Sequence, residues 1–181
     1  MNNTQKNWLK YIAVFITCLL FRFIPFRAPN IEPILATQMP FAKAYGKISG
    51  FSFGFFSVIV YDILTGTVGK WTFVTASAYG LLGLWAYLYF KNKNSSSWNY
   101  AKFAVMGTIV FDVVTGFSVG PLFFHQSLMN AFVGQIPFTI LHLLGNVSFA
   151  LILSPEIYNF AVRKKKKTVV VPINIFNPKI I

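Results

Sequence analysis

Apolar stretches of about 20 residues recur along most of the chain, and this feature limits the possible fold more than any other. The hydrocarbon core of a bilayer is about 30 Å thick, and a helix that crosses it satisfies its own backbone hydrogen bonds. Of the 181 residues, 55% are hydrophobic and 11% are charged, whereas soluble domains carry about 25% charged residues. The sequence therefore predicts an all-α fold, a polytopic bundle of membrane-spanning helices.

The chain divides into six candidate spans, of which the second is short. They lie at residues 11–24, 31–45, 47–65, 71–90, 101–119 and 127–153. The first span follows two lysines, and this order of charged and apolar residues resembles a signal sequence. No small-residue cleavage site comes after it, so we expect the segment to be retained as a span. Polar residues interrupt the apolar face of the second, so we expect it to be tilted, re-entrant or buried.

Basic residues gather in two segments, which predict how the bundle is oriented. Five of them form the run Arg163–Lys167 after the last span, and three lysines lie in the loop Lys91–Lys102. Because positive residues beside spans stay on the cytoplasmic side, we expect both segments in the cytoplasm and a multi-pass protein of the plasma membrane. Six spans would place the amino terminus inside and five would place it outside. We predict a membrane bundle over residues 1–155 and a basic, loosely ordered cytoplasmic tail over residues 156–181.

The formal net charge of +12 does not predict nucleic-acid binding, because the basic residues lie at span ends, in loops and in the tail. The run Arg163–Lys167 instead predicts contact with anionic lipid headgroups. Cys18 is the single cysteine, and His125 and His142 have no acidic residue at ligand spacing. We therefore expect neither a metal site nor a cofactor.

Two segments 50 residues apart repeat the order aromatic, Asp, two apolar residues, Thr and Gly. They are Tyr61–Gly66 at the end of the third span and Phe111–Gly116 at the end of the fifth. Each is followed by a turn and a returning helix, so the repeat predicts a duplicated helical hairpin in parallel orientation. A carboxylate inside a membrane needs a polar cavity or a partner. We expect Asp62 and Asp112 to face the interior, each about one helical turn below the external turn.

Polar residues of two other spans point to the same interior. The fourth span carries Trp71, Thr72, Thr75 and Tyr79, and the sixth carries a polar stripe at helical spacing. Together with the two aspartates they predict a ligand-binding site made of Asp62, Asp112, Trp71, Thr75, Tyr79, Gln135, His142 and Asn146. The alternative to a ligand role is structural: each carboxylate caps a neighbouring helix or accepts a hydrogen bond from the Thr three residues later.

A charged, proline-marked segment lies near the outer end of the first span. It holds Arg22, Arg27, Asn30 and Glu32. This segment is either a lid over an external pocket or a solvated loop, and the sequence leaves both open.

The chain resembles the substrate-binding S components of energy-coupling factor transporters, loosely and over residues 8–153. The resemblance rests on Asp62 before a glycine-marked turn, then on Trp71-Thr72 and on Thr75-Ala76-x-x-Tyr79-Gly80. It implies a six-helix fold, cytoplasmic termini and a vitamin or related micronutrient bound near the external face. It also implies a transmembrane coupling subunit and two cytoplasmic ATPases as partners. The Ala-x-x-x-Ala face that docks the coupling subunit in those proteins is represented here by Ala13 and Thr17.

Three functions remain open, and we expect no enzyme. The first is a membrane-embedded solute-binding subunit of a micronutrient uptake transporter, with Asp62 and Asp112 contacting donors on a small molecule. The second is a non-transporting membrane scaffold in which the polar groups only hold helices together. The third is an intramembrane aspartyl protease, which is disfavoured because the second aspartate lacks a preceding Gly-x-Gly and there is no Pro-Ala-Leu segment. A cavity of a few hundred Å³ near the aspartates would favour solute binding.

Overall fold

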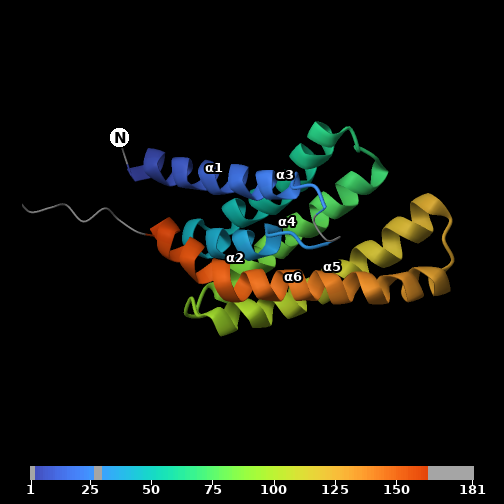
Figure 1. Cartoon of the computed structure of the whole chain (residues 1–181). Helices are drawn as coiled ribbons and strands as arrows, with labels where there is room; N and C mark the ends of the chain where they lie inside the picture. Colours follow the sequence, from blue (N-terminus) through green and yellow to red (C-terminus); the bar gives the residue numbers. More distant parts are fainter. Residues whose placement is uncertain (1–2, 27–29, 163–181) are drawn as a thin grey trace, which may run out of the picture.

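The computed structural model describes residues 3–26 and 30–162, which form six helices and contain no strand. Figure 1 shows α1 (Asn3–Arg22), α2 (Ile34–Tyr45), α3 (Lys47–Thr65), α4 (Lys70–Phe90), α5 (Ser97–Phe124) and α6 (Leu128–Val162). The predicted all-α bundle is confirmed. Arg27 lies outside the described residues. The run Arg163–Lys167 also lies outside them, so its predicted contact with lipid headgroups stays a prediction.

Four helices, α3 to α6, are long and apolar enough to cross a membrane. They support the prediction of a multi-pass membrane protein. The first ten residues of the chain are mostly polar, and α1 does not reach the same apolarity. With 12 residues, α2 is too short for a bilayer core that takes about 20.

The short helix α2 lies inside the bundle. All residues from Ile34 to Ala42 are buried, and the helix packs against α3, α4 and α6. Its buried Gln38 amide donates hydrogen bonds to the carbonyl of Gly50 at 2.8 Å and to the carbonyl of Tyr79 at 2.6 Å. Of the three placements predicted for the second span, burial is the one observed, because neighbouring helices satisfy its polar side chains.

Small residues bring α2, α3 and α4 close together. A Cβ atom at Gly50 would lie 2.6 Å from the Cβ of Ala42 and 2.7 Å from the carbonyl oxygen of Gly83. At Gly54 it would lie 2.6 Å from the carbonyl oxygen of Tyr79. A side chain at either position would therefore push the helices apart.

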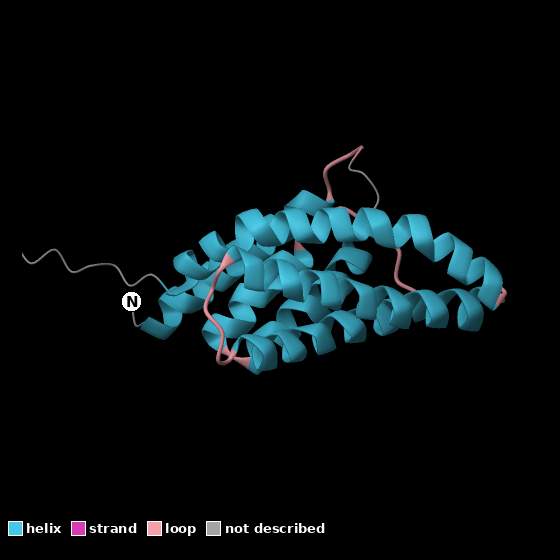
Figure 2. Ribbon diagram, turned by 90° about the horizontal axis from the view of Figure 1, so that it is seen from below, coloured by secondary structure: helices cyan, strands magenta, loops and turns pink. Residues whose placement is uncertain are grey.

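The turns α3–α4 (residues 66–69) and α5–α6 (residues 125–127) lie at one end of the bundle, which we call the hairpin end. The start of α1 and the end of α6 lie at the opposite end, called the terminal end (Figures 1 and 2). Asp62 is three residues from the end of α3, as expected, but Asp112 is twelve residues from the end of α5. The expectation that Asp112 lies about one helical turn below its turn is therefore wrong.

The second hairpin is longer because α5 continues past the repeat. Residues 117–124 are mostly apolar, and Pro121 lies inside the helix without ending it. The helix ends where His125 takes a left-handed conformation with φ 52° and the Gln126 N–H bonds to the carbonyl of Gly120 at 3.3 Å. The helix therefore extends beyond residue 119, where the fifth span was expected to end.

The helix α6 continues through Pro155 to Val162, beyond the boundary predicted at residue 155. Its last turns are tied to the rest of the bundle. The Ser154 hydroxyl donates to the carbonyl of Ala36 at 2.6 Å, and the carbonyl of Ala161 accepts from the hydroxyl of Tyr45 at 2.9 Å. These contacts hold the segment after Pro155 in the bundle, which the composition did not indicate.

Candidate functional site

A cavity of about 310 Å³ lies at the hairpin end, within the size range of small-molecule sites. Every helix except α2 contributes to its wall, as does the segment between α1 and α2. The lining residues are Arg22, Asn30, Glu32, Val58, Asp62, Trp71, Thr75, Tyr79, Phe111, Thr115, Phe138 and His142. The wall thus combines charged groups of both signs with aromatic rings.

Asp62 reaches the cavity from the last turn of α3 and is 9% exposed. Its Oδ2 atom accepts a hydrogen bond from the Thr72 hydroxyl, in the first turn of α4, at 2.5 Å. Thr65, three residues after Asp62, bonds instead to the carbonyl of Tyr61 at 2.8 Å. The partner of this carboxylate is therefore a side chain of the neighbouring helix and not Thr65.

Asp112 lies behind His142 and does not line the cavity. Its Oδ1 atom is 2.7 Å from Nδ1 of His142, and the two side chains are 1% and 3% exposed. The Thr115 hydroxyl donates to the carbonyl of Phe111 at 2.8 Å and not to the carboxylate. Because Asp112 holds Nδ1, the Nε2 atom of His142 faces the cavity side, 3.4 Å from the Tyr79 hydroxyl.

The polar contacts continue from Tyr79 to α1. The Tyr79 hydroxyl donates to Oε1 of Glu32 at 2.9 Å, and Oε2 of Glu32 is 2.9 Å from Nε of Arg22. Arg22 and Glu32 are 11% and 12% exposed. A chain of contacts thus joins Arg22, Glu32, Tyr79, His142 and Asp112, and each member restrains the next.

The charged, proline-marked segment that begins with Arg22, at the end of α1, was predicted to be either a lid or a solvated loop. Arg22, Asn30 and Glu32 all line the cavity, and the Arg22–Glu32 pair is nearly excluded from solvent. These described members of the segment are therefore part of the wall of the cavity, which excludes the solvated loop for them.

Aromatic contacts connect the two hairpins near the cavity. The rings of Trp71 in α4 and Phe124 at the end of α5 lie 5.5 Å apart, centroid to centroid. The rings of Tyr79 and Phe111 lie 4.3 Å apart. Trp71 and Tyr79 are therefore wall residues held in place by the neighbouring hairpin.

The structure brings together five of the eight residues predicted for the ligand site. Asp62, Trp71, Thr75, Tyr79 and His142 line the cavity, and Asp112 contacts it through His142.

Gln135 and Asn146 do not line the cavity, so their assignment to the site is not supported. The Gln135 amide donates to the Thr139 hydroxyl at 3.3 Å, and the buried Asn146 amide donates to the Thr108 hydroxyl at 2.8 Å. Both share the polar stripe of α6 with His142. A helix of 35 residues carries such a stripe well beyond a cavity at one depth.

Sequence reasoning missed four wall residues, Val58, Phe111, Thr115 and Phe138. Phe138 lies four residues before His142, and Val58 lies four residues before Asp62. Positions i and i+4 share a helix face, so this spacing was a usable signal.

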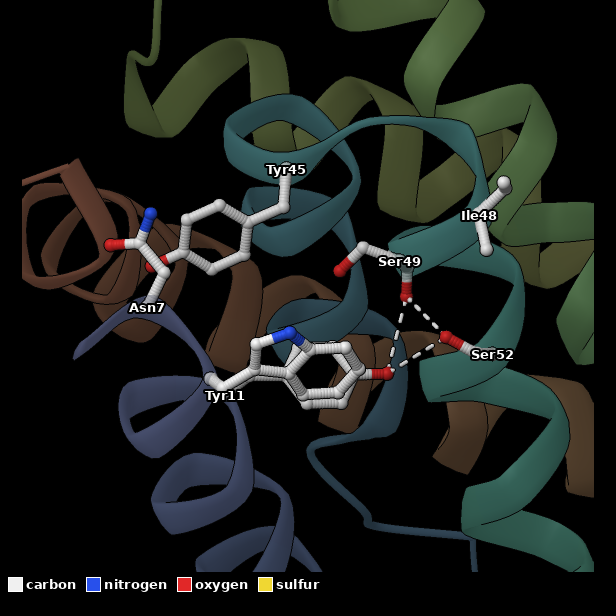
Figure 3. A pocket seen from close by; sticks show the side chains of 7 residues that line it. Asn7, Tyr11, Tyr45, Ile48, Ser49 and Ser52 are labelled. Atoms are coloured by element: carbon white, nitrogen blue, oxygen red, sulfur yellow. Dashed lines mark hydrogen bonds between the residues drawn. The ribbon is translucent and has the colours of Figure 1, made fainter. Parts of the chain in front are cut away.

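A second cavity, of about 270 Å³, lies at the terminal end. Figure 3 shows its wall, formed by Asn7, Trp8, Tyr11, Tyr45, Ile48, Ser49 and Ser52. The Tyr11 hydroxyl lies 3.1 Å from Oγ of Ser52 and donates to the carbonyl of Ser49 at 3.3 Å. Among the described residues, the wall of this cavity has no charged side chain, and none of the predicted site residues lies there.

Within residues 3–26 and 30–162, no group of three or more His, Cys, Asp or Glu side chains is placed to hold a metal ion. The expected absence of a metal site stays a prediction for the chain as a whole.

Comparisons with known proteins give a family but no assigned activity. No curated protein matches the chain, and no solved structure matches it. A family model described as a family of unknown function, DUF6580, matches residues 2–170, a range that includes all six helices and every residue of the cavity at the hairpin end. The chain therefore belongs to the DUF6580 family.

Proposed function

We propose that this protein is a membrane-embedded solute-binding subunit of an uptake transporter, which captures a small molecule in the cavity at the hairpin end. The observation that carries the proposal is the cavity itself, about 310 Å³ among helices long and apolar enough to span a membrane. Aromatic side chains and convergent polar groups, both present in this wall, are usual features of a small-molecule site. A scaffold would not need such a cavity.

The orientation that we propose places this cavity at the external face of the plasma membrane. The loop between α4 and α5, which carries Lys91 and Lys93, lies at the end of the bundle opposite the cavity. If this loop is cytoplasmic, as positive charge favours, the hairpin end is external. The site is then open to solutes that arrive from outside the cell.

The resemblance to S components of energy-coupling factor transporters supports the same proposal and adds partners. In this reading, a transmembrane coupling subunit and two cytoplasmic ATPases drive reorientation and release of a micronutrient. Ala13 and Thr17 both lie on the exposed face of α1, where such a subunit would dock. Capture by this chain would require no catalysis.

The arrangement of the two aspartates gives no support to an intramembrane aspartyl protease. In such an enzyme two carboxylates share one site. Here Asp62 lines the cavity and bonds to Thr72, whereas Asp112 lies outside the wall and pairs with the wall residue His142.

Native mass spectrometry of the full chain, purified in mild detergent from its own cells, tests the proposal. We expect a retained small molecule and co-purifying ATPase subunits. Asp62→Asn should reduce the retained fraction because it alters the wall. Asp112→Asn should also reduce the retained fraction, because it changes the hydrogen bond that orients His142.

The matched control is Ser52→Ala, in the wall of the other cavity, which should leave retention unchanged. Both aspartate variants should keep the size-exclusion profile of the parent protein. Absence of a retained molecule, or equal retention in Asp62→Asn and the parent, would contradict the proposed function.

A further inference from the structure

Asp62 brings a negative charge to the cavity that no cation among the described residues neutralises. In the part of the chain that the structure describes, no Lys, Arg or His side chain lies within 4.0 Å of its carboxylate. Among the described residues, its carboxylate accepts one side-chain hydrogen bond, from the neutral hydroxyl of Thr72. A carboxylate that is 9% exposed among membrane helices favours a cation as its partner.

The one Arg or Lys among the described wall residues, Arg22, is already occupied. Its Nε atom lies 2.9 Å from Oε2 of Glu32, and its Nη1 atom donates to the carbonyl of Ser57 at 2.8 Å. The guanidinium also lies over the ring of Tyr61, 3.8 Å from the centroid. These contacts leave Arg22 poorly placed to bind an anion, because an anion would compete with Glu32.

Acidic groups outnumber basic groups around the cavity. Glu32 and Asp62 line it, and Asp112 adjoins it through His142. Arg22 is the one Arg or Lys among the described wall residues and balances one of these three carboxylates. If His142 also carried a proton, the described residues would still have one negative charge in excess. Charges act strongly at such a site, since the effective dielectric constant is far below that of water.

Aromatic rings complete the wall. Trp71, Tyr79, Phe111 and Phe138 all line the cavity. The faces of such rings attract cations and also pack against flat or apolar groups. A ligand with a cationic group and a compact apolar or ring-shaped body would match both parts of the wall.

We infer that the cavity selects a small organic cation, such as a protonated amine or a charged heteroaromatic ring, whose charge lies against Asp62. This inference rests on the proposed function and names the class of its solute. The charge of Asp62 sets the selectivity, and the aromatic rings hold the remainder of the molecule. Asp62 is thus a specificity-determining residue.

Three probes of similar size and different charge test the inference: benzylammonium, benzyl alcohol and benzoate. Their binding to the purified full chain in detergent is measured at neutral pH by calorimetry. We expect benzylammonium to bind at least about tenfold more tightly than benzyl alcohol, and benzoate to bind most weakly. Asp62→Asn should bring the affinity for benzylammonium close to that for benzyl alcohol and leave the alcohol unaffected.

Ser52→Ala serves again as the control and should preserve the preference for the cation. Equal or tighter binding of benzoate, or an unchanged preference in folded Asp62→Asn, would overturn the inference. If all three probes are too small to bind, the molecule retained in native mass spectrometry decides. A retained cation supports the inference, whereas a retained neutral molecule or acid overturns it and leaves the proposed function standing. If nothing is retained and no probe binds, both fail.

Discussion

Nδ1 of His142 lies 2.7 Å from Oδ1 of Asp112, and both side chains are almost completely buried. The pair joins α6 to α5, just as the Thr72–Asp62 hydrogen bond joins α4 to α3. Each repeated aspartate therefore ties together the two helices of its own hairpin. The two ties differ in chemistry, because one partner is a neutral hydroxyl and the other is a titratable ring.

Removal of the Asp112 carboxylate should destabilise the bundle. Asp112→Ala leaves the buried Nδ1 of His142 without its partner, so we expect a loss of about 1–3 kcal/mol in the free energy of unfolding. Asp112→Asn should cost less, because an amide oxygen still accepts from Nδ1. Thermal unfolding in detergent, followed by circular dichroism, measures both. Equal melting temperatures for Asp112→Ala and the parent protein would show that the pair adds nothing to stability.

Gly50→Ala should destabilise the contact of α3 with α2 and α4. The new Cβ would meet Ala42 and the backbone of Gly83, which cannot move aside as a flexible side chain can. Overpacking of this kind costs about 1–3 kcal/mol. The matched control is Gly134→Ala in α6, where no atom lies within 4 Å of the new Cβ. Similar melting temperatures for the two variants would contradict the close approach of the helices.

The partly buried pair of Arg22 and Glu32 should show energetic coupling. In a double-mutant cycle with Arg22→Gln and Glu32→Gln, we expect the double variant to lose less stability than the two single losses combined. The difference should be about 0.5–3 kcal/mol for side chains in direct contact. Glu32→Gln alone should also strengthen benzoate binding, because it releases Arg22. Strictly additive losses would show that the pair is not coupled.

Cysteine labelling tests the predicted orientation. The native Cys18 is buried, so the parent protein should react little with a membrane-impermeant maleimide. Thr67→Cys and Ser127→Cys lie at exposed positions of the two hairpin turns and should be labelled in intact cells. Asn92→Cys, in the exposed loop between α4 and α5, should be labelled only after the cells are permeabilised. The reverse pattern would place the cavity on the cytoplasmic side.

Much of the fold follows from local pattern. The length of each apolar run predicts a membrane helix, because the bilayer sets how many residues are needed. The repeat correctly identified two antiparallel helix pairs whose turns lie at the same end of the bundle. Helical spacing also identified Trp71, Thr75, Tyr79 and His142 as residues of one wall, since residues three or four apart share a face.

The membership of the site and the partners of its polar groups depended on how the helices pack against one another. Asp112 repeats Asp62 in sequence, yet it lies deeper in its hairpin and outside the wall of the cavity. Asn146 lies on the same polar stripe of α6 as His142, but its amide donates a hydrogen bond to the Thr108 hydroxyl. Nothing local to Glu32 indicates that it bonds to Tyr79 from a segment 47 residues away.

The sequence by itself determined that this chain is a bundle of apolar helices with polar groups on their inner faces. Only the tertiary structure decided which of those groups meet around a cavity and which bond to one another. The physical reason is that periodicity specifies the face of a helix on which a side chain lies. Its depth and its partner depend on how closely the helices pack, which contacts such as that of Gly50 with Gly83 set between segments far apart in the chain.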